Sequence, residues 1–281
     1  MSGALRFLLL FLLGSRMAGA ADVTWILPEF PPAFIQGPFR AHEGYGDRQL
    51  KFLIDHLPQF HHTIITAPAS RLWHEMEHRD GVCTLAVAKL PEREKVAIFS
   101  ARAYWATSNQ VIVRTDRLEA FAPLLDKSGA IDLSRLAADA SLRGGYSDNT
   151  SYGPSIEGFI HDPDRKARLE DMPHLRMPLV LIDKKRFDFG FGYFMEMNFY
   201  RQLNRLEDHF TALRTLPEPA RQDGHVACSN QSLGRTVIAA IDALLATDEG
   251  MQAYIEPLRD WYSPADFEAA QRAAKSAGPI K

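Results

Sequence analysis

The sequence predicts an α/β protein of two lobes, each a central sheet flanked by helices. Three observations support this prediction. Residues 23–88 alternate between strand-like and helix-like segments, a second alternating series begins after Arg114, and the last part of the chain returns to a strand followed by helices. Such alternation is typical of parallel sheets covered by helices. A chain that completes one α/β unit, builds a second and then returns requires two crossover segments between two lobes.

The first series begins with a strand at residues 23–27, which are rich in apolar and β-branched residues. Pro31 and Pro32 cannot continue this strand, because proline has no amide hydrogen for the ladder. Leucines spaced along one face predict a helix at 47–56. The series continues with a strand at 63–66, a helix at 70–79 and a strand at 82–88.

The second series is less regular. Residues 118–125 and 133–137 have helical patterns, and paired glycines end a short strand at 141–145. The polar loop SDNTSYG then leads into a helix at 154–160. The remaining predicted elements are strands at 179–182 and 187–193, a helix at 198–204, a strand at 226–228, and helices at 237–246 and 250–258.

The first twenty residues have the parts of a secretory signal peptide. Arg6 precedes an apolar run at 7–13 that is too short to span a bilayer, and the small residues Ala18, Gly19 and Ala20 follow. We expect cleavage near Ala20 and export of the protein. No cysteine follows the apolar run, which argues against a lipid anchor.

The overall charge excludes some functions. Loss of the leader changes the formal net charge from −3 to −5, because the leader contains two arginines and no acid. A mildly acidic protein offers no electrostatic surface for nucleic acid or for anionic membranes. With 46% hydrophobic residues, the chain can bury one large core or two lobes.

Residues 81–105, GVCTLAVAKLPEREKVAIFSARAYW, place a charged turn between two apolar runs. Arg93 lies in this turn, the second run ends at Ser100, and Tyr104 and Trp105 close the stretch. The segments EGYGDRQLKFL, RGGYSDNTSYG and LLATDEGMQAYIEPLRDWY occur elsewhere in the chain. In this order, the four segments resemble the type II periplasmic solute-binding proteins of the polar-amino-acid class (family 3), over most of the mature chain.

The resemblance implies a periplasmic-binding-protein-like clamshell that traps a small molecule between its lobes. Lobe one would comprise residues 22–107 plus 226–281, lobe two residues 108–225, and hinge motion near 107–110 and 224–226 would close the cleft. It also implies a periplasmic monomer without cofactor, serving an ABC transporter or a sensor, with an inner-membrane permease or sensor as partner. The expected ligand is a small, amino-acid-like carboxylate.

The resemblance gives the main ligand contact to Arg93. A guanidinium at the carboxyl end of a parallel strand presents a planar fork to a carboxylate, and ligands of open α/β sheets bind outside those strand ends. On lobe two, a helix N-terminus offers N–H groups and hydroxyls to the same anion. The expected ligand-binding residues are Glu29, Phe30, Tyr45, Lys89, Arg93, Tyr104, Asn149, Thr150, Ser151, Tyr152, Tyr193 and Glu196.

These residues also have plain structural interpretations. Arg93 is alternatively a surface arginine paired with Glu92 or Glu94, residues 149–151 are a helix cap, and the aromatic side chains belong to the core. Two positions depart from the family pattern. Leu90 replaces the threonine three positions before the arginine, and Tyr193 replaces the acid that holds a ligand ammonium. The departures argue against an ordinary α-amino acid. The aromatic residues Phe30, Phe34, Tyr45, Tyr104, Trp105 and Tyr193 favour a flatter or more apolar solute.

A rival motif is HEMEH, at residues 74–78. Two imidazoles one helical turn apart, with Glu75 as general base, would make a zinc metalloprotease. Thr84 stands where the longer zinc motif has its third histidine. Helical geometry also places His74 and His78 opposite the apolar face, so we expect them to face solvent. Residues 61–62, two histidines, are expected at a strand edge. An enzyme built on the clamshell fold is a further alternative.

The chain has two cysteines, Cys83 and Cys228. The resemblance places them on neighbouring or nearby strands of lobe one, and export would supply an oxidising compartment. We therefore expect a disulfide that closes a loop of about 145 residues. The alternative is a pair of buried free thiols.

Overall fold

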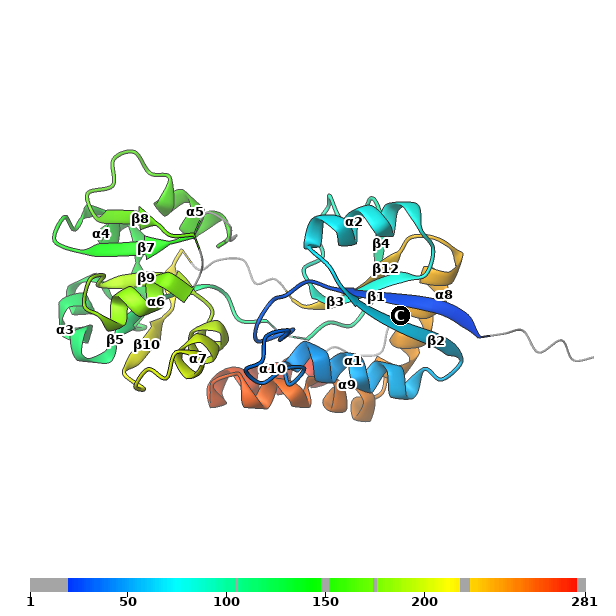
Figure 1. The fold of residues 1–281 in the computed structure, drawn as a ribbon. Coiled ribbons are helices and arrows are strands. Elements are labelled where there is room, and N and C mark those ends of the chain that lie inside the picture. Colours follow the sequence, from blue (N-terminus) through cyan, green and yellow to red (C-terminus); the bar gives the residue numbers. More distant parts are fainter. Residues whose placement is uncertain (1–19, 105, 148–151, 174–175, 218–222, 277–281) are drawn as a thin grey trace, which may run out of the picture.

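The computed structural model describes residues 20–104, 106–147, 152–173, 176–217 and 223–276. They form two lobes that lie side by side, each with a five-stranded sheet flanked by helices (Figure 1). The predicted fold class is confirmed. The predicted signal peptide falls outside the described residues, apart from Ala20.

The sheet of lobe one contains the strands β1 (Ala21–Leu27), β2 (Phe60–Thr66), β3 (Val82–Val87), β4 (Ala97–Phe99) and β12 (His225–Ser229). Their order is β2-β1-β3-β12-β4. β1 pairs in parallel with β2 and β3, whereas β12 is antiparallel to β3 and β4. The sheet is therefore mixed, because the chain returns from lobe two at the edge where β3 ends and runs back through the sheet.

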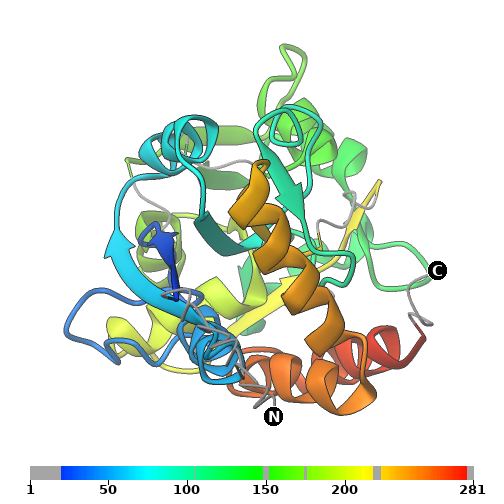
Figure 2. The same cartoon turned by 90° about the vertical axis from the view of Figure 1, so that its right-hand side faces the viewer.

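Lobe one has helices on both faces of this sheet: α1 (Tyr45–His56), α2 (Ala69–His78), α8 (Ser232–Leu245), α9 (Asp248–Ile255), the 3-10 helix η3 (Glu256–Asp260) and α10 (Pro264–Ser276). Side chains alternate along β1. Val23, Trp25 and Leu27 join the core with α1, α8 and α9, whereas Ile26 packs with Leu72 and other residues of α2. Figure 2 shows α8 lying across the sheet, with α9 and α10 along one edge of the lobe.

The sheet of lobe two has the order β10-β5-β9-β7-β8. Its strands are β5 (Gln110–Arg114), β7 (Arg143–Tyr146), β8 (Arg168–Asp171), β9 (Phe189–Gly192) and β10 (Phe210–Leu213). Its helices are α3 (Leu118–Phe121), α4 (Leu133–Ala138), α5 (Pro154–Ile160), α6 (Arg176–Asp183) and α7 (Phe194–Leu203). The short elements are η1 (Thr115–Arg117), η2 (Ala122–Leu124), β6 (Ile131–Asp132) and β11 (Thr215–Leu216). β7 is parallel to β8 and β9, whereas β5 is antiparallel to β9 and β10.

One predicted element of lobe two is wrong. Residues 179–182 belong to the helix α6, not to a strand. A short apolar run has no periodicity that separates a buried strand from a buried helix. In the helix, Leu179 and Ile182 lie on one face and pack with Ile112 of β5. The predicted helix at 198–204 begins earlier, at Phe194.

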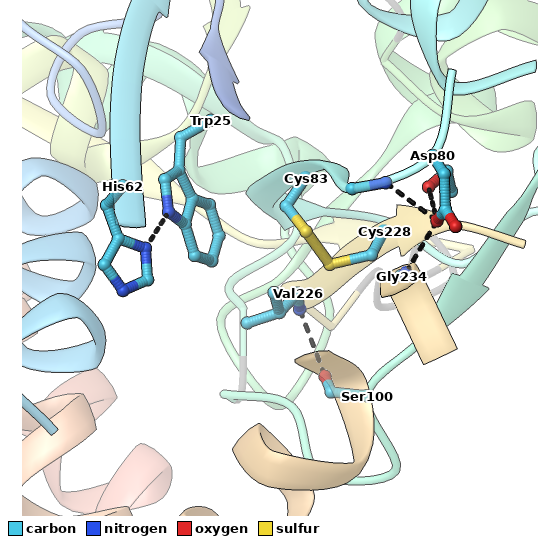
Figure 3. The surroundings of a disulfide bond; sticks show 10 residues. Trp25, His62, Asp80, Cys83, Ser100, Val226, Cys228 and Gly234 are labelled. Atoms are coloured by element: carbon cyan, nitrogen blue, oxygen red, sulfur yellow. Dashed lines mark hydrogen bonds between the residues drawn. A yellow bond between two sulfur atoms is a disulfide. The ribbon is translucent and has the colours of Figure 1, made fainter. Parts of the chain in front are cut away.

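The predicted disulfide between Cys83 and Cys228 is confirmed. The two residues lie opposite each other on β3 and β12, and neither is exposed to solvent (Figure 3). The bond links strands that are 145 residues apart in the sequence. It therefore joins two parts of lobe one that lobe two separates in the sequence.

Asp80 connects the loop before β3 to α8 (Figure 3). Its carboxylate accepts hydrogen bonds from the backbone N–H groups of Gly81, Leu233 and Gly234, at 2.8 to 2.9 Å. The position before α8, Gln231, supplies no side-chain cap. Asp80 therefore caps α8 from a distant part of the sequence.

Two connections join the lobes. An antiparallel bridge pairs Tyr104 in the first with Gly224 in the second. Within the described part of the chain, no helix is both long and apolar enough to cross a membrane.

Candidate functional site

Arg93 lies in a short turn just beyond the carboxyl end of β3. The turn is closed by the N–H groups of Arg93 and Glu94, which donate to Leu90 O at 2.9 and 3.0 Å. The guanidinium lies 4.8 Å from the ring centroid of Trp73 on α2, and its Nη1 donates to Ala88 O at 3.0 Å. These contacts hold the planar fork in one orientation while leaving it half-buried.

Arg93 forms no ion pair with any residue that the structure describes. Glu94, one predicted partner, pairs instead with Lys89 at 3.2 Å. Burial lowers the pKa of Arg93, and the nearby charge of Glu92 partly offsets this effect. An arginine keeps its proton in proteins in any case. The turn thus contains a half-buried positive charge that forms no ion pair with a carboxylate of the described residues.

Trp73 is a member of this site that the sequence did not reveal. Its place among the apolar residues of α2 indicated a core residue, and it does pack against the core on that face of the sheet. It is only partly buried, however, and its ring supports Arg93. A contact between residues that far apart leaves no mark in the sequence pattern.

His225 also lies at this edge of the sheet, opposite Val87 at the end of β3. Its Nδ1 lies 2.9 Å from Ser100 O. Burial lowers the pKa of His225, and the charge of Lys89 lowers it further, against opposing effects of Ser100 and Asp223. His225 is therefore mainly neutral at pH 7 and adds a polar group without a charge. His225 stands one residue before the predicted strand at 226–228, and this position was the only available signal.

Tyr45 and Tyr104 lie together inside lobe one. Their hydroxyl oxygens are 3.3 Å apart and their ring centroids 5.8 Å apart. Both are buried, at 1% and 3% exposure, and burial raises the pKa of each. They match the core interpretation that the sequence left open.

Tyr193 and Glu196 lie where β9 ends and α7 begins. Glu196 Oε2 accepts a hydrogen bond from Tyr193 N at 3.3 Å. Burial raises the pKa of Glu196 to about 7, although the Tyr193 N–H lowers it. Burial and the charge of Glu196 raise the pKa of Tyr193 to about 12, and a hydrogen bond with Asn109 opposes this.

α7 brings these two residues to the junction of the lobes. Its Phe199 belongs to the core of lobe one, with ring centroids 5.8 Å from Phe39 and 6.1 Å from Trp261. Arg40 stacks on Trp261 at 4.4 Å, and its Nη1 reaches Gln202 Oε1 at 3.5 Å. The lobes are therefore in apolar contact along this helix.

The other expected ligand residues are spread more widely. Glu29 and Phe30 lie in the exposed loop after β1, where Phe30 and Phe34 exchange two backbone hydrogen bonds. Tyr152 is buried against Phe191 and accepts a hydrogen bond from Ser147 N at 2.9 Å, as a structural residue would. Asn149, Thr150 and Ser151 lie outside the described residues, as does Trp105.

The HEMEH segment forms part of α2. His74 and His78 are exposed, as predicted, and His78 Nδ1 lies 2.8 Å from His74 O. Glu75 forms ion pairs with Arg71 and Arg79, which lower its pKa. The described residues contain no group of three or more His, Cys, Asp or Glu side chains arranged to hold a metal. A general base would need a free carboxylate, and Glu75 does not provide one.

The paired histidines at 61–62 lie on β2, at the edge of the sheet as expected. His61 Nδ1 lies 2.8 Å from the Asp22 carboxylate. His62 accepts a hydrogen bond from Trp25 Nε1 at 3.0 Å (Figure 3). Both imidazoles thus have structural partners.

No protein-family model matches the chain, and no curated protein matches its sequence. Solved structures do match. The probable amino-acid ABC transporter extracellular-binding protein YtmK of Bacillus subtilis has a TM-score of 0.65 at 14% identity, over 88% of this chain and 99% of that chain. The GluR0 ligand-binding core, solved with L-glutamate, has a TM-score of 0.60 at 13% identity, over 88% and 100%.

A structure from the glutathione import system GshT and TcyBC of Streptococcus mutans has a TM-score of 0.61 at 10% identity, over 86% of this chain and 95% of that chain. At such low identities the likeness concerns the fold. The chain has the two-lobed fold of type II periplasmic binding proteins.

Proposed function

We propose that the protein is an exported solute-binding protein that captures a small, carboxylate-bearing molecule between its lobes, for transport or sensing. The observation that carries this proposal is Arg93. Its guanidinium lies at the carboxyl end of β3, stacks on Trp73 and has no acidic partner among the described residues. A charge in this position is ready for an incoming carboxylate.

The proposed lobes are residues 22–107 plus 226–281 and residues 108–225, with ligand entry from the cleft between them. Lys89, Glu29 and Phe30 would line the site around Arg93. Residues 149–151 would approach from lobe two. Several matching solved structures are binding proteins of amino-acid ABC transporters, which supports a solute-binding role with a permease as partner.

A ligand screen tests the proposal. Purified residues 21–281 would be heated with amino acids, aromatic carboxylates, polyamines and sugars in turn. A true ligand at a hundredfold over its Kd should stabilise the fold by about 2.7 kcal/mol. We expect the responding compounds to carry a carboxylate.

Arg93→Ala then tests the residue. Loss of this charge-assisted pair should weaken carboxylate binding by about 2 to 5 kcal/mol. Arg259→Ala is a matched control, because Arg259 also stacks on an aromatic ring, that of Phe267, and pairs with Glu256. Calorimetric titration should show loss of binding in the first variant only. Equal affinity in both variants would show that the turn has a purely structural role.

A further inference from the structure

Two histidines lie one helical turn apart on the solvent side of α2. His74 and His78 are both exposed, whereas Leu72 and Met76 of the same helix are buried against the sheet of lobe one. The centroids of the two imidazole rings are 4.3 Å apart, and the ring planes differ by 33°. Residues four positions apart in a helix are neighbours on its surface. The helix therefore holds the two rings together without help from any other element.

A hydrogen bond fixes the tautomer of one of these rings. His78 Nδ1 lies 2.8 Å from His74 O. Because a carbonyl oxygen can only accept, Nδ1 carries the hydrogen and donates it. In the neutral ring, Nε2 of His78 then keeps its lone pair. A histidine that binds a metal usually has this arrangement, with one ring nitrogen donating to a carbonyl and the other left for the ion.

Other side chains do not compete for these two rings. Throughout the described part of the chain, no side chain forms a hydrogen bond or an ion pair with His74 or His78. Glu75, which follows His74, is held by Arg71 and Arg79. The neighbouring histidines of β2 both have structural partners. The imidazole pair of α2 is therefore open to an ion from solvent.

The charges around the pair favour a cation. α2 ends at His78, and the carboxyl end of a helix has a partial negative charge. Glu77 is exposed beside His78 and forms no ion pair with a described residue. The nearby positive charge of Arg79 is paired with Glu75. A divalent cation is thus attracted to the same turn in which the two imidazoles lie.

We propose that His74 and His78 form a surface site for a divalent late transition-metal ion, such as nickel, copper or zinc, with both imidazoles as ligands. Imidazole nitrogen suits these metals, whereas magnesium and calcium prefer oxygen. Two protein ligands leave the remaining coordination positions to water, so the site binds the ion reversibly. The inference goes beyond the proposed solute-binding role and does not depend on it. It also requires no general base, in contrast to a zinc protease.

Titration with nickel(II) tests the site directly. Residues 21–281 would be purified without a histidine tag and titrated in a calorimeter at about pH 7.5, where free imidazole is mainly neutral. We expect a single nickel ion to bind per chain, and copper(II) to bind more tightly. Magnesium should not bind. Nickel should also raise the Tm, because the unfolded chain does not hold the two rings together.

Single variants identify the ligands. His74→Ala and His78→Ala should each weaken nickel binding by about tenfold or more, since loss of an outer partner of a ligand already has an effect of this size. His61→Ala is the matched control, because it removes an exposed histidine from β2. This variant should bind nickel as the unchanged protein does. Arg93→Ala should do the same, which separates this site from the proposed carboxylate site.

A double variant tests the spacing. The exchange His78→Arg, Arg79→His keeps the composition and the charge but places the imidazoles five positions apart, about 140° around the helix. Nickel binding should then fall as far as in the single alanine variants. Circular dichroism would establish that each variant is folded, as we expect for changes on an exposed helix face.

Three results would overturn the inference. Unchanged nickel affinity in His74→Ala and His78→Ala would exclude these residues as ligands. Equal affinity in the exchange variant would show that the helical spacing has no role. Equal binding of magnesium would show that the carboxylates, and not the imidazoles, attract the ion.

Discussion

Glu196 illustrates how strongly position alters the chemistry of a single side chain. Glu75, on an exposed helix, has two arginine partners and a lowered pKa, whereas Glu196, buried without a cation, has a pKa raised to about 7. The sequence presents both as glutamates near the start or middle of a helix. Their difference arises from tertiary packing, which determines which carboxyl meets water and which meets apolar atoms.

The raised pKa predicts a dependence of stability on pH. Below about pH 4.5, the ordinary value for Glu, the carboxyl is protonated in both the folded and the unfolded protein. As the pH rises from about 4.5 towards 7, the Glu196 carboxyl ionises in the unfolded chain but stays protonated in the folded protein. The free energy of unfolding therefore falls over this range. The loss should be on the order of 3 kcal/mol and complete above about pH 7.

Glu196→Gln should remove this slope, because glutamine fits the same space without titrating. Urea unfolding at intervals between about pH 5 and 8 would measure the free energy of unfolding of both proteins. Glu77→Gln, on the exposed side of α2, serves as a control and should keep the slope. Parallel curves for the unchanged protein and Glu196→Gln would contradict the prediction.

The candidate site was only partly predictable from its residues. Arg93 was identified because its turn lies in a recognisable order of segments. The structure adds that Glu94 forms an ion pair with Lys89 and not with Arg93. Trp73 and His225 were missed, since their roles depend on contacts between α2, β12 and the turn. The ligand role of Arg93 stays a prediction, which Arg93→Ala tests.

Among the elements, long periodic helices and alternating strands were predictable, whereas short apolar segments were not. α1, α2 and α8 have clear apolar faces that persist over several turns. The segment that became α6 has only a short run of apolar residues, and its helix is stabilised by packing against β5 and β9. Local sequence leaves such a segment undecided, and tertiary contacts determine its form.

α8 depends on Asp80 at its first turn. Replacing Asp80 by Ala leaves the N–H groups of Leu233 and Gly234 without their acceptor. The free energy of unfolding should fall by about 1 to 2 kcal/mol. Chemical denaturation would measure this loss, with Asp55→Ala as the control, since Asp55 forms only an exposed pair with Lys51. A loss of the same size in Asp55→Ala would argue against a specific capping role.

At the scale of the whole molecule, the lobes are joined by two chain connections, which contain Tyr104 and Gly224, and by the packing of α7. The contact of Phe199 with Phe39 and Trp261 gives the lobes a shared apolar surface. Hinge closure near 107–110 and 224–226 stays a prediction. We expect any such motion to pivot along α7, because a rotation about this helix preserves its packing while moving the opposite rims together.

The disulfide acts at this same scale. The double variant Cys83→Ala, Cys228→Ala removes a link that closes a loop of 145 residues. The unfolded chain gains conformational freedom, and the stability of lobe one should fall by about 2 to 5 kcal/mol. Thermal melts of the double variant against the oxidised protein would measure the change. Two reactive thiols in the denatured, unreduced protein would contradict the bond itself.

The position of β12 has a consequence for the time at which each lobe can form. Among the strands that the structure describes, β4 pairs only with β12, and β12 lies between β3 and β4. A chain that emerges from a translocation channel amino end first exposes β1 to β4 long before it delivers β12. We therefore expect lobe two, whose strands all lie between Gln110 and Leu216, to fold first. Until the last fifth of the chain has been translocated, the sheet of lobe one lacks β12 and stays incomplete. During this time Cys83 is a free thiol, accessible to chaperones and oxidants.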